Sequence, residues 1–168
     1  MKKTLIVVDM QNDFIDMALG TKEAVAIVPA VRAKIEEYKN RGDEIIFTRD
    51  THGENYLDTP EGKKLPVPHC IKGTKGWEIA DGLYVDVAKI IDKPNFGWPN
   101  WCEEALEDVE LIGLCTDICV VSNALIIKAA FPDAQVSVDA GCCAGVTPET
   151  HNAALATMKM CQIDVIGE

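Results

Sequence analysis

The chain has 168 residues, 48% of them hydrophobic, which suits one globular domain (residues 1–168) built around a single core. Its formal net charge of −11 and its pI near 4.7 disfavour binding to a nucleic-acid backbone, which needs concentrated Lys and Arg. No apolar run approaches the roughly 20 residues of a membrane span, and the N-terminus turns acidic before a signal-peptide core is complete. We therefore expect a cytoplasmic protein without nucleic-acid or membrane partners.

Short β-rich runs alternate with helical patterns along the chain. Thr147 followed by Pro148 predicts the cap and the first turn of the last helix. The alternation predicts an α/β domain with a mostly parallel sheet and helices on both of its faces. The predicted strands are 4–9, 44–50, 88–93, 109–114, 135–140 and 162–167, and the predicted helices are 22–40, 117–131 and 148–160.

One connection, residues 50–87, is long and rich in Gly, Pro and His. Connections of that length in a compact domain more often have a function than serve only to join two elements.

The seven cysteines are an odd number and contain no CxxC pair. This pattern supports neither a disulfide framework nor a thiolate zinc finger. We expect reduced cysteines that are mostly small buried hydrophobes, which leaves room for one reactive thiol.

Chemically active side chains stand where the predicted strands end. Asp9, Asp50 and Lys93 end the first three strands, and Cys119 follows the fourth strand at the start of a helix. Taken singly, they also fit a turn residue, a surface lysine and a buried thiol. Because ligands collect beyond the carboxyl ends of parallel strands, their convergence favours a shared site.

These residue types suit nucleophilic catalysis by a thiolate. A helix N-terminus or a cation stabilises a thiolate, and a nearby base can take its proton. Asp9 would be that base, and Lys93 would hold thiolate and carboxylate together. The backbone N–H groups of Cys115 and Cys119 are our candidates for stabilising an oxyanion.

The motifs resemble those of the isochorismatase-like cysteine hydrolases, a family that includes nicotinamidases and pyrazinamidases. The resemblance covers nearly the whole chain in family order: VVDMQNDF (7–14), TRDTH (48–52), DKPNF (92–96), GLCTDICV (113–120) and VDAGCCAGVTPETH (138–151). It implies a six-stranded three-layer α/β/α fold, an Asp9, Lys93 and Cys119 triad, a cis peptide between Leu114 and Cys115, and an oxyanion hole at Cys115 and Cys119.

The resemblance also implies a divalent metal. Asp50 and His52 match the Asp-x-His pair of nicotinamidase-like members, and His69 matches their distal histidine. Where many members have a further His, this chain has Glu54, Asn55 or Asp58, so Glu61 is the expected fourth ligand. Two imidazoles and two carboxylates suit zinc first, with manganese or iron as alternatives.

The implied reaction is hydrolysis of a small amide, nicotinamide first, through a thioester, with a role in NAD salvage. Phe14 and Leu19 are expected to wall the substrate pocket, and Trp98 or Trp101 to close it. Phe96 replaces the family's usual Tyr, and Val67 and Pro68 replace an aromatic residue beside the distal histidine.

Three alternatives stay open. Another amide or carbamoyl hydrolase would favour arginine in the pocket, and the chain offers only Arg32, Arg41 and Arg49. An isochorismatase would not need the metal ligands, and a non-enzymatic binding protein would have an inert Cys119. The apolar segment 119–131 and the frequent oligomers of the family suggest a homo-oligomer. A helix buried within one subunit fits the segment equally.

Overall fold

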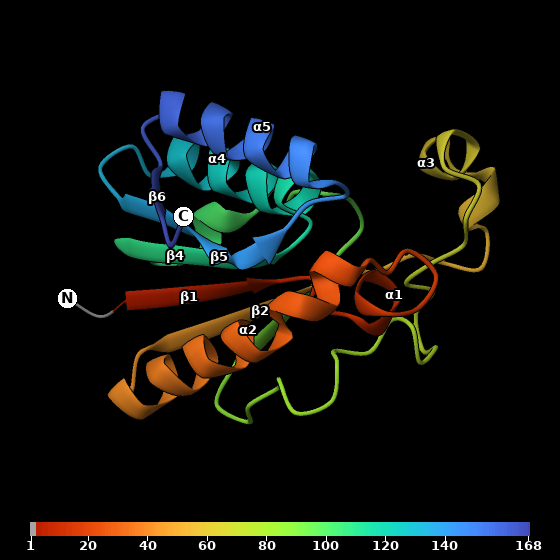
Figure 1. Ribbon diagram of the computed structural model, residues 1–168, viewed down its shortest axis with the longest axis horizontal. Helices are drawn as coiled ribbons and strands as arrows, with labels where there is room; N and C mark the ends of the chain where they lie inside the picture. Colours follow the sequence, from red (N-terminus) through yellow and green to blue (C-terminus); the bar gives the residue numbers. More distant parts are fainter. Residues whose placement is uncertain (1–2) are drawn as a thin grey trace.

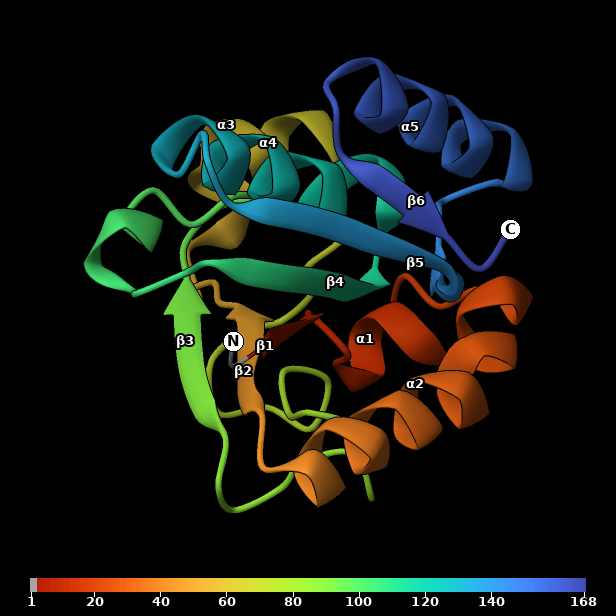
Figure 2. The ribbon, with the colours of Figure 1, turned by 90° about the vertical axis from the view of Figure 1, so that its left-hand side faces the viewer.

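The computed structural model describes residues 3–168, in which one sheet is covered on both faces by helices (Figure 1). The strand order is β3-β2-β1-β4-β5-β6, and all neighbouring strands pair in parallel. Figure 2 shows the twist of the sheet, with β3 and β5 running in clearly different directions. The six-stranded α/β architecture expected from the sequence is confirmed.

The predicted elements match the observed ones closely in place. The strands are β1 (Lys3–Val8), β2 (Glu44–Asp50), β3 (Lys89–Lys93), β4 (Asp108–Leu114), β5 (Gln135–Ala144) and β6 (Asp164–Ile166). The α-helices are α1 (Asn12–Ile15), α2 (Lys22–Arg41), α3 (Pro60–Lys64), α4 (Val121–Ala130) and α5 (Pro148–Met160). Single turns lie at Tyr56–Asp58, Trp101–Glu103 and Thr116–Val120, the last of them π-helical.

Several boundaries differ from the predictions for local reasons. Strand β1 ends at Val8, because Asp9 has a positive φ of 46°, and the predicted helix 117–131 divides into the π-helical turn and α4. Strand β5 continues past its glycine to Ala144, because its pairing with β4 shifts register between Leu111 and Gly113 and then resumes. Strand β6 is shorter than predicted. Gln162 has a positive φ of 62°, so the chain is still turning away from α5 at that point.

The alternation of side chains along β1 builds two cores. Leu5 and Val7 point to the face covered by α2, whereas Ile6 and Val8 point to the face covered by α4 and α5. All four side chains are fully buried. The central strand is therefore apolar on both sides, as expected for a parallel sheet between two helical layers.

The helix ends follow the capping rules. The Thr21 hydroxyl accepts the Ala24 N–H at the start of α2, and Gly42 ends that helix in the left-handed conformation, φ 73°. Thr147 caps α5 as predicted and Pro148 occupies its first turn. Among the residues that the structure describes, no helix is long and apolar enough to cross a membrane.

The first part of the connection from β2 to β3, which includes α3, lies beyond the carboxyl ends of the strands near α1, and the later part runs back beside α2 to β3 (Figure 1). A parallel bridge joins His52 to Ile71, through hydrogen bonds from His52 N–H to the Cys70 carbonyl and from Lys72 N–H to the His52 carbonyl, both 2.9 Å. This bridge brings the two ends of a long loop segment together at the sheet edge.

Candidate active site

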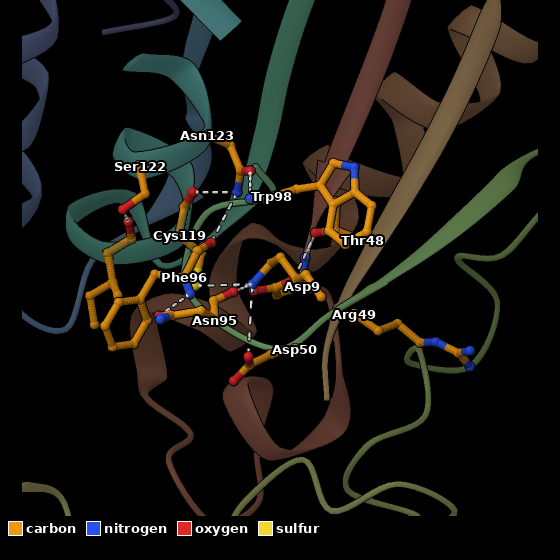
Figure 3. A network of polar contacts seen from close by, with 12 residues as sticks. Asp9, Thr48, Arg49, Asp50, Asn95, Phe96, Trp98, Cys119, Ser122 and Asn123 are labelled. Atoms are coloured by element: carbon orange, nitrogen blue, oxygen red, sulfur yellow. Dashed lines mark hydrogen bonds and ion pairs between the residues drawn. The ribbon is translucent and has the colours of Figure 1, made fainter. Parts of the chain in front are cut away.

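The ends of β1 and β3 and the turn after β4 bring three predicted residues into contact. Lys93 Nζ lies 2.6 Å from Asp9 Oδ2 and 3.5 Å from Cys119 Sγ. Asp9 and Lys93 are fully buried, and Cys119 is 4% exposed. Figure 3 shows Asp9 and Cys119 converging from different elements. The structure thus brings together a carboxylate, an ammonium and a thiol out of contact with bulk water.

Asp9 is held in an unusual backbone conformation, with φ 46°. Asp tolerates this left-handed region better than most residues, and such residues are often functional. Its Oδ1 accepts a 2.6 Å hydrogen bond from the Thr48 hydroxyl, whereas Oδ2 faces only the ammonium of Lys93. The carboxylate that directly follows β1 is therefore fixed in one orientation.

The electrostatics favour a neutral thiol beside a pair of opposite charges. Burial raises the pKa of Cys119 well above its ordinary value, Asp9 raises it further, and Lys93 opposes both. Burial also raises the pKa of Asp9, against the lowering effect of Lys93 and Thr48. Burial lowers the pKa of Lys93, but Asp9, Cys119 and Asp50 outweigh it and the net shift is upward. Burial thus favours the neutral thiol of Cys119, and Asp9 is the neighbouring acid that could accept its proton.

The nucleophile turn begins after β4. The peptide bond between Leu114 and Cys115 is cis, as the resemblance implied. The π-helical turn Thr116–Val120 then carries Cys119 into α4. Short π-helical segments are rare and are frequent at functional sites. Cys115 and Cys119 line the same cavity.

The four predicted metal ligands form a second cluster beside the triad. One ligand atom from each of Asp50, His52, Glu61 and His69 lies within 4.8 Å of the others. His52 Nε2 is 2.9 Å and His69 Nε2 is 3.5 Å from Asp50 Oδ2. Glu61 Oε1 is 3.6 Å from His52 Nε2 and 3.7 Å from His69 Nε2. Glu61 is thus the carboxylate that the loop places beside the two histidines.

This donor set fits a divalent metal. His69 Nδ1 lies 2.8 Å from the Val67 carbonyl, an arrangement that leaves Nε2 free as a ligand and is typical of metal-binding histidines. Asp50 Oδ1 is buried without a hydrogen-bond donor among the described residues. The Tyr56 ring packs edge-on against both imidazoles, with ring centroids 4.8 and 5.0 Å away. Asp50 Oδ2, which faces both imidazoles, and the oriented His69 ring are donors that suit a metal of this class.

Two residues that the sequence reasoning missed hold this cluster in place. Gln11 grips Asp50 from both sides: its Nε2 donates to the Asp50 carbonyl at 2.9 Å, and its Oε1 accepts the Asp50 N–H at 2.8 Å. Asp13 Oδ2 accepts the N–H of Cys70, next to His69, at 2.8 Å. Both lie in the motif that follows Asp9, where polar residues interrupt an apolar run. That interruption is the sequence feature that could have pointed to these two residues.

Two neighbouring cavities lie at the site, and the inner one reaches the thiol. The inner one, about 50 Å³, is lined by residues that include Phe14, Leu19, Phe96 and Cys119. The outer one, about 350 Å³, also touches Phe96, and it is lined further by Pro60 and Lys64. The two cavities share four lining residues: Glu61, Leu65, Phe96 and Ile118. The expected walls Phe14, Leu19 and Phe96 are therefore in place.

The expectation that a tryptophan closes the pocket is wrong. Trp101 is fully buried in the core beneath α4, and Trp98 packs against the same core. Both donate hydrogen bonds to Asn123 Oδ1, Trp98 through its backbone N–H and Trp101 through Nε1, each 2.8 Å. Neither tryptophan is among the lining residues of the two cavities.

Comparisons with known proteins cover the whole described chain. A family profile described as Isochorismatase domain matches residues 3–167. The nicotinamidase/pyrazinamidase of Mycobacterium tuberculosis is 26% identical, over 98% of this chain and 98% of that protein. The pyrazinamidase of Pyrococcus horikoshii, solved in complex with zinc, has a TM-score of 0.86 at 28% identity and covers 100% of both chains.

The similar proteins also include one of Arabidopsis thaliana that is named a probable inactive nicotinamidase. It is 30% identical, over 92% of this chain and 87% of that protein. Overall similarity alone therefore does not decide activity, which has to be argued from the residues of the site.

Proposed function

Because the chain belongs to the isochorismatase family, we propose that it is a cysteine amidohydrolase whose first candidate substrate is nicotinamide. The observation that carries the proposal is the contact of Lys93 with both Asp9 and Cys119 beside a cavity. The relatives named nicotinamidase or pyrazinamidase support an aromatic amide as substrate.

In the first half of the proposed reaction, the substrate carboxamide enters the inner cavity with its carbon against Cys119. Asp9 accepts the thiol proton as the sulfur attacks, which forms a C–S bond and a negatively charged oxygen. The backbone N–H groups of Cys115 and Cys119 would stabilise that oxygen. Asp9 then returns the proton to the nitrogen, the C–N bond breaks, and ammonia leaves a thioester on Cys119.

In the second half, a water molecule gives a proton to Asp9 while its oxygen attacks the thioester carbon. The C–S bond breaks, the Asp9 proton returns to the sulfur, and the carboxylic acid leaves. Amide and water are thus converted to acid and ammonia, with Asp9 and Cys119 restored. Lys93 keeps its charge throughout, since nearby carboxylates raise its pKa, and it stabilises whichever neighbour is negative.

We propose that a divalent metal, zinc before manganese or iron, is held by Asp50, His52, Glu61 and His69. When bound, the metal would act as a Lewis acid able to coordinate the ring nitrogen of the substrate. Phe14, Leu19 and Phe96 would enclose a flat ring between this position and the thiol. The zinc complex of the Pyrococcus horikoshii pyrazinamidase supports this assignment.

The alternatives are less favoured by particular residues. A carbamoyl substrate would call for arginine, yet Arg49 pairs with Asp92 and stacks on Trp77, and Arg41 pairs with surface acids. Neither is among the lining residues of the inner cavity. An isochorismatase would leave the cluster of Asp50, His52, Glu61 and His69 without a purpose. Cytoplasmic location, a homo-oligomer and service in NAD salvage remain predictions.

The test is ammonia release from nicotinamide by the purified protein, together with elemental analysis of bound metal. We expect one divalent metal per chain and ammonia release that is lost on chelation and in Cys119→Ala. Cys102→Ala is the matched control, because that cysteine is exposed and outside the cavity. Full activity in Cys119→Ala would refute the cysteine mechanism. A metal-loaded protein without nicotinamide turnover would redirect the search to other amides.

A further inference from the structure

We infer that Asn123 is a positioning residue that fixes the nucleophile turn and the Phe96 wall of the cavity relative to each other. The inference rests on the proposed cysteine chemistry. Asn123 is fully buried in α4, four residues after Cys119, inside the apolar segment 119–131. Asparagine is unfavourable in a helix interior, and a buried asparagine needs hydrogen-bond partners for its side-chain amide.

The Asn123 side chain uses its entire hydrogen-bonding capacity. Its Nδ2 donates to the Cys119 carbonyl at 2.8 Å and to the Phe96 carbonyl at 3.1 Å. Its Oδ1 accepts two hydrogen bonds, both 2.8 Å, from the Trp98 backbone and the Trp101 indole. An amide has two donors and two acceptor positions, and all four are satisfied here. Figure 3 shows Asn123 between Cys119, Phe96 and Trp98.

The loop that Asn123 holds belongs to the site. It begins just after Lys93, whose Nζ donates to the Asn95 carbonyl at 3.1 Å. Phe96 then lines both cavities. Gly97 packs against α4, where a Cβ at this position would lie 2.4 Å from Ile126 Cδ1 and 3.5 Å from Ser122 Cβ. One amide group thus ties the backbone of the nucleophile to the loop that carries the substrate wall.

The donors and the acceptor of Asn123 bond different partners, so variants can remove the two kinds of hydrogen bond separately. Its acceptor oxygen holds the two tryptophans, whereas its donors reach Cys119 and Phe96. Asn123→Asp keeps the shape and the acceptor oxygen but can donate at most one hydrogen bond, so it cannot serve both carbonyls. Asn123→Leu removes all four hydrogen bonds at similar size.

We would measure kcat and KM for nicotinamide, normalised to active sites titrated through Cys119, and the rate of Cys119 alkylation by iodoacetamide. In both variants we expect kcat/KM per active site to fall by about tenfold or more, because small misplacements of reacting groups are costly. We also expect a rise in KM from the displaced Phe96 wall and an altered alkylation rate.

Two controls separate positioning from stability. Ile127→Ala removes a fully buried side chain of the same helix, so it should lower the melting temperature while kcat/KM per active site stays within about twofold. Thr157→Ala removes a hydroxyl that bonds only the Ala153 carbonyl within α5. It should leave both readouts unchanged.

Wild-type kcat/KM and alkylation rate per active site in folded Asn123→Asp would overturn the inference. The same result in Asn123→Leu would do so as well. If Asn123→Leu does not fold, the nearly isosteric Asn123→Asp decides alone. If the wild-type protein hydrolyses no amide, the proposed function fails, and the alkylation rates still show whether Asn123 positions the thiol.

Discussion

The ammonium of Lys93 lies 2.6 Å from Asp9 Oδ2, and both side chains are completely shielded from solvent. Removing one member of such a pair leaves the other buried and uncompensated, at a cost of about 3–5 kcal/mol. Asp50 Oδ1, 3.9 Å from Lys93 Nζ, is the other carboxylate near the ammonium. The pair thus couples the chemistry of the site to the stability of the fold.

This coupling predicts the behaviour of three variants. Asp9→Asn and Lys93→Met should each lose at least about a hundredfold in turnover, the lower bound for a general base. Asparagine suits the left-handed backbone at this position, so Asp9→Asn should stay folded. In urea unfolding, Lys93→Met should be less stable than the double variant Lys93→Met with Asp9→Asn. A double variant that is less stable than Lys93→Met would contradict the coupling.

The hydroxyl of Thr48 should set the acid limb of the pH profile. Its hydrogen bond to Asp9 favours the carboxylate and lowers the pKa of Asp9, so Thr48→Val should raise that pKa. Asp9 must be ionised to accept a proton, so the half-maximal pH of kcat/KM on the acid side should move upward. Thr4→Val, at the far end of β1, is the control and should not move it. A uniform fall in kcat/KM without a shift would argue against Asp9 as the base.

Histidine substitution should remove the metal. In His69→Ala, metal content after dialysis should drop from one per chain toward zero, with affinity lower by at least about 10–100-fold. His151→Ala should retain its metal, because His151 bonds Thr116 outside the cluster. Elemental analysis of both proteins decides between these outcomes. Equal metal content would show that the ion binds elsewhere.

The passage between the two cavities should control substrate size. Leu65 lines both cavities and is 40% exposed, so Leu65→Ala should widen the opening without unfolding the loop. We expect kcat/KM for ring-substituted nicotinamides to rise several-fold relative to nicotinamide, in line with the value of a few apolar contacts. Leu57→Ala, an exposed residue of the same loop outside both cavities, should leave the ratio unchanged. An unchanged ratio in Leu65→Ala would rule out this passage as the route of entry.

Some of the site could be predicted from the sequence, because the topology of a parallel sheet brings the residues at the strand ends together. Asp50 and Lys93 end their strands and Asp9 directly follows β1, and the carboxyl ends of parallel strands share one edge. Their convergence therefore needed no knowledge of packing. The grouping of His52 with His69 could be predicted only from the family resemblance, since it depends on a bridge inside an irregular loop.

Other features depend on partners distant in the sequence. The Trp101 indole and the Trp98 backbone both bond Asn123, more than twenty positions later, so the local sequence could not place these residues. The same is true of Gln11, whose role appears only when β2 lies alongside β1. Both amides are buried polar residues in apolar surroundings, and this is the pattern that could have drawn attention to them.

Strand β3 is a five-residue edge strand that pairs only with β2, and this pairing sets Lys93 opposite Asp50. Side chains alternate between the faces of a sheet, so a slip by one residue would turn Lys93 to the opposite face. Chain length can vary in the exposed parts of the preceding connection without reaching the triad. A single inserted residue within β3 would disable the site while leaving each of its side chains present in the sequence.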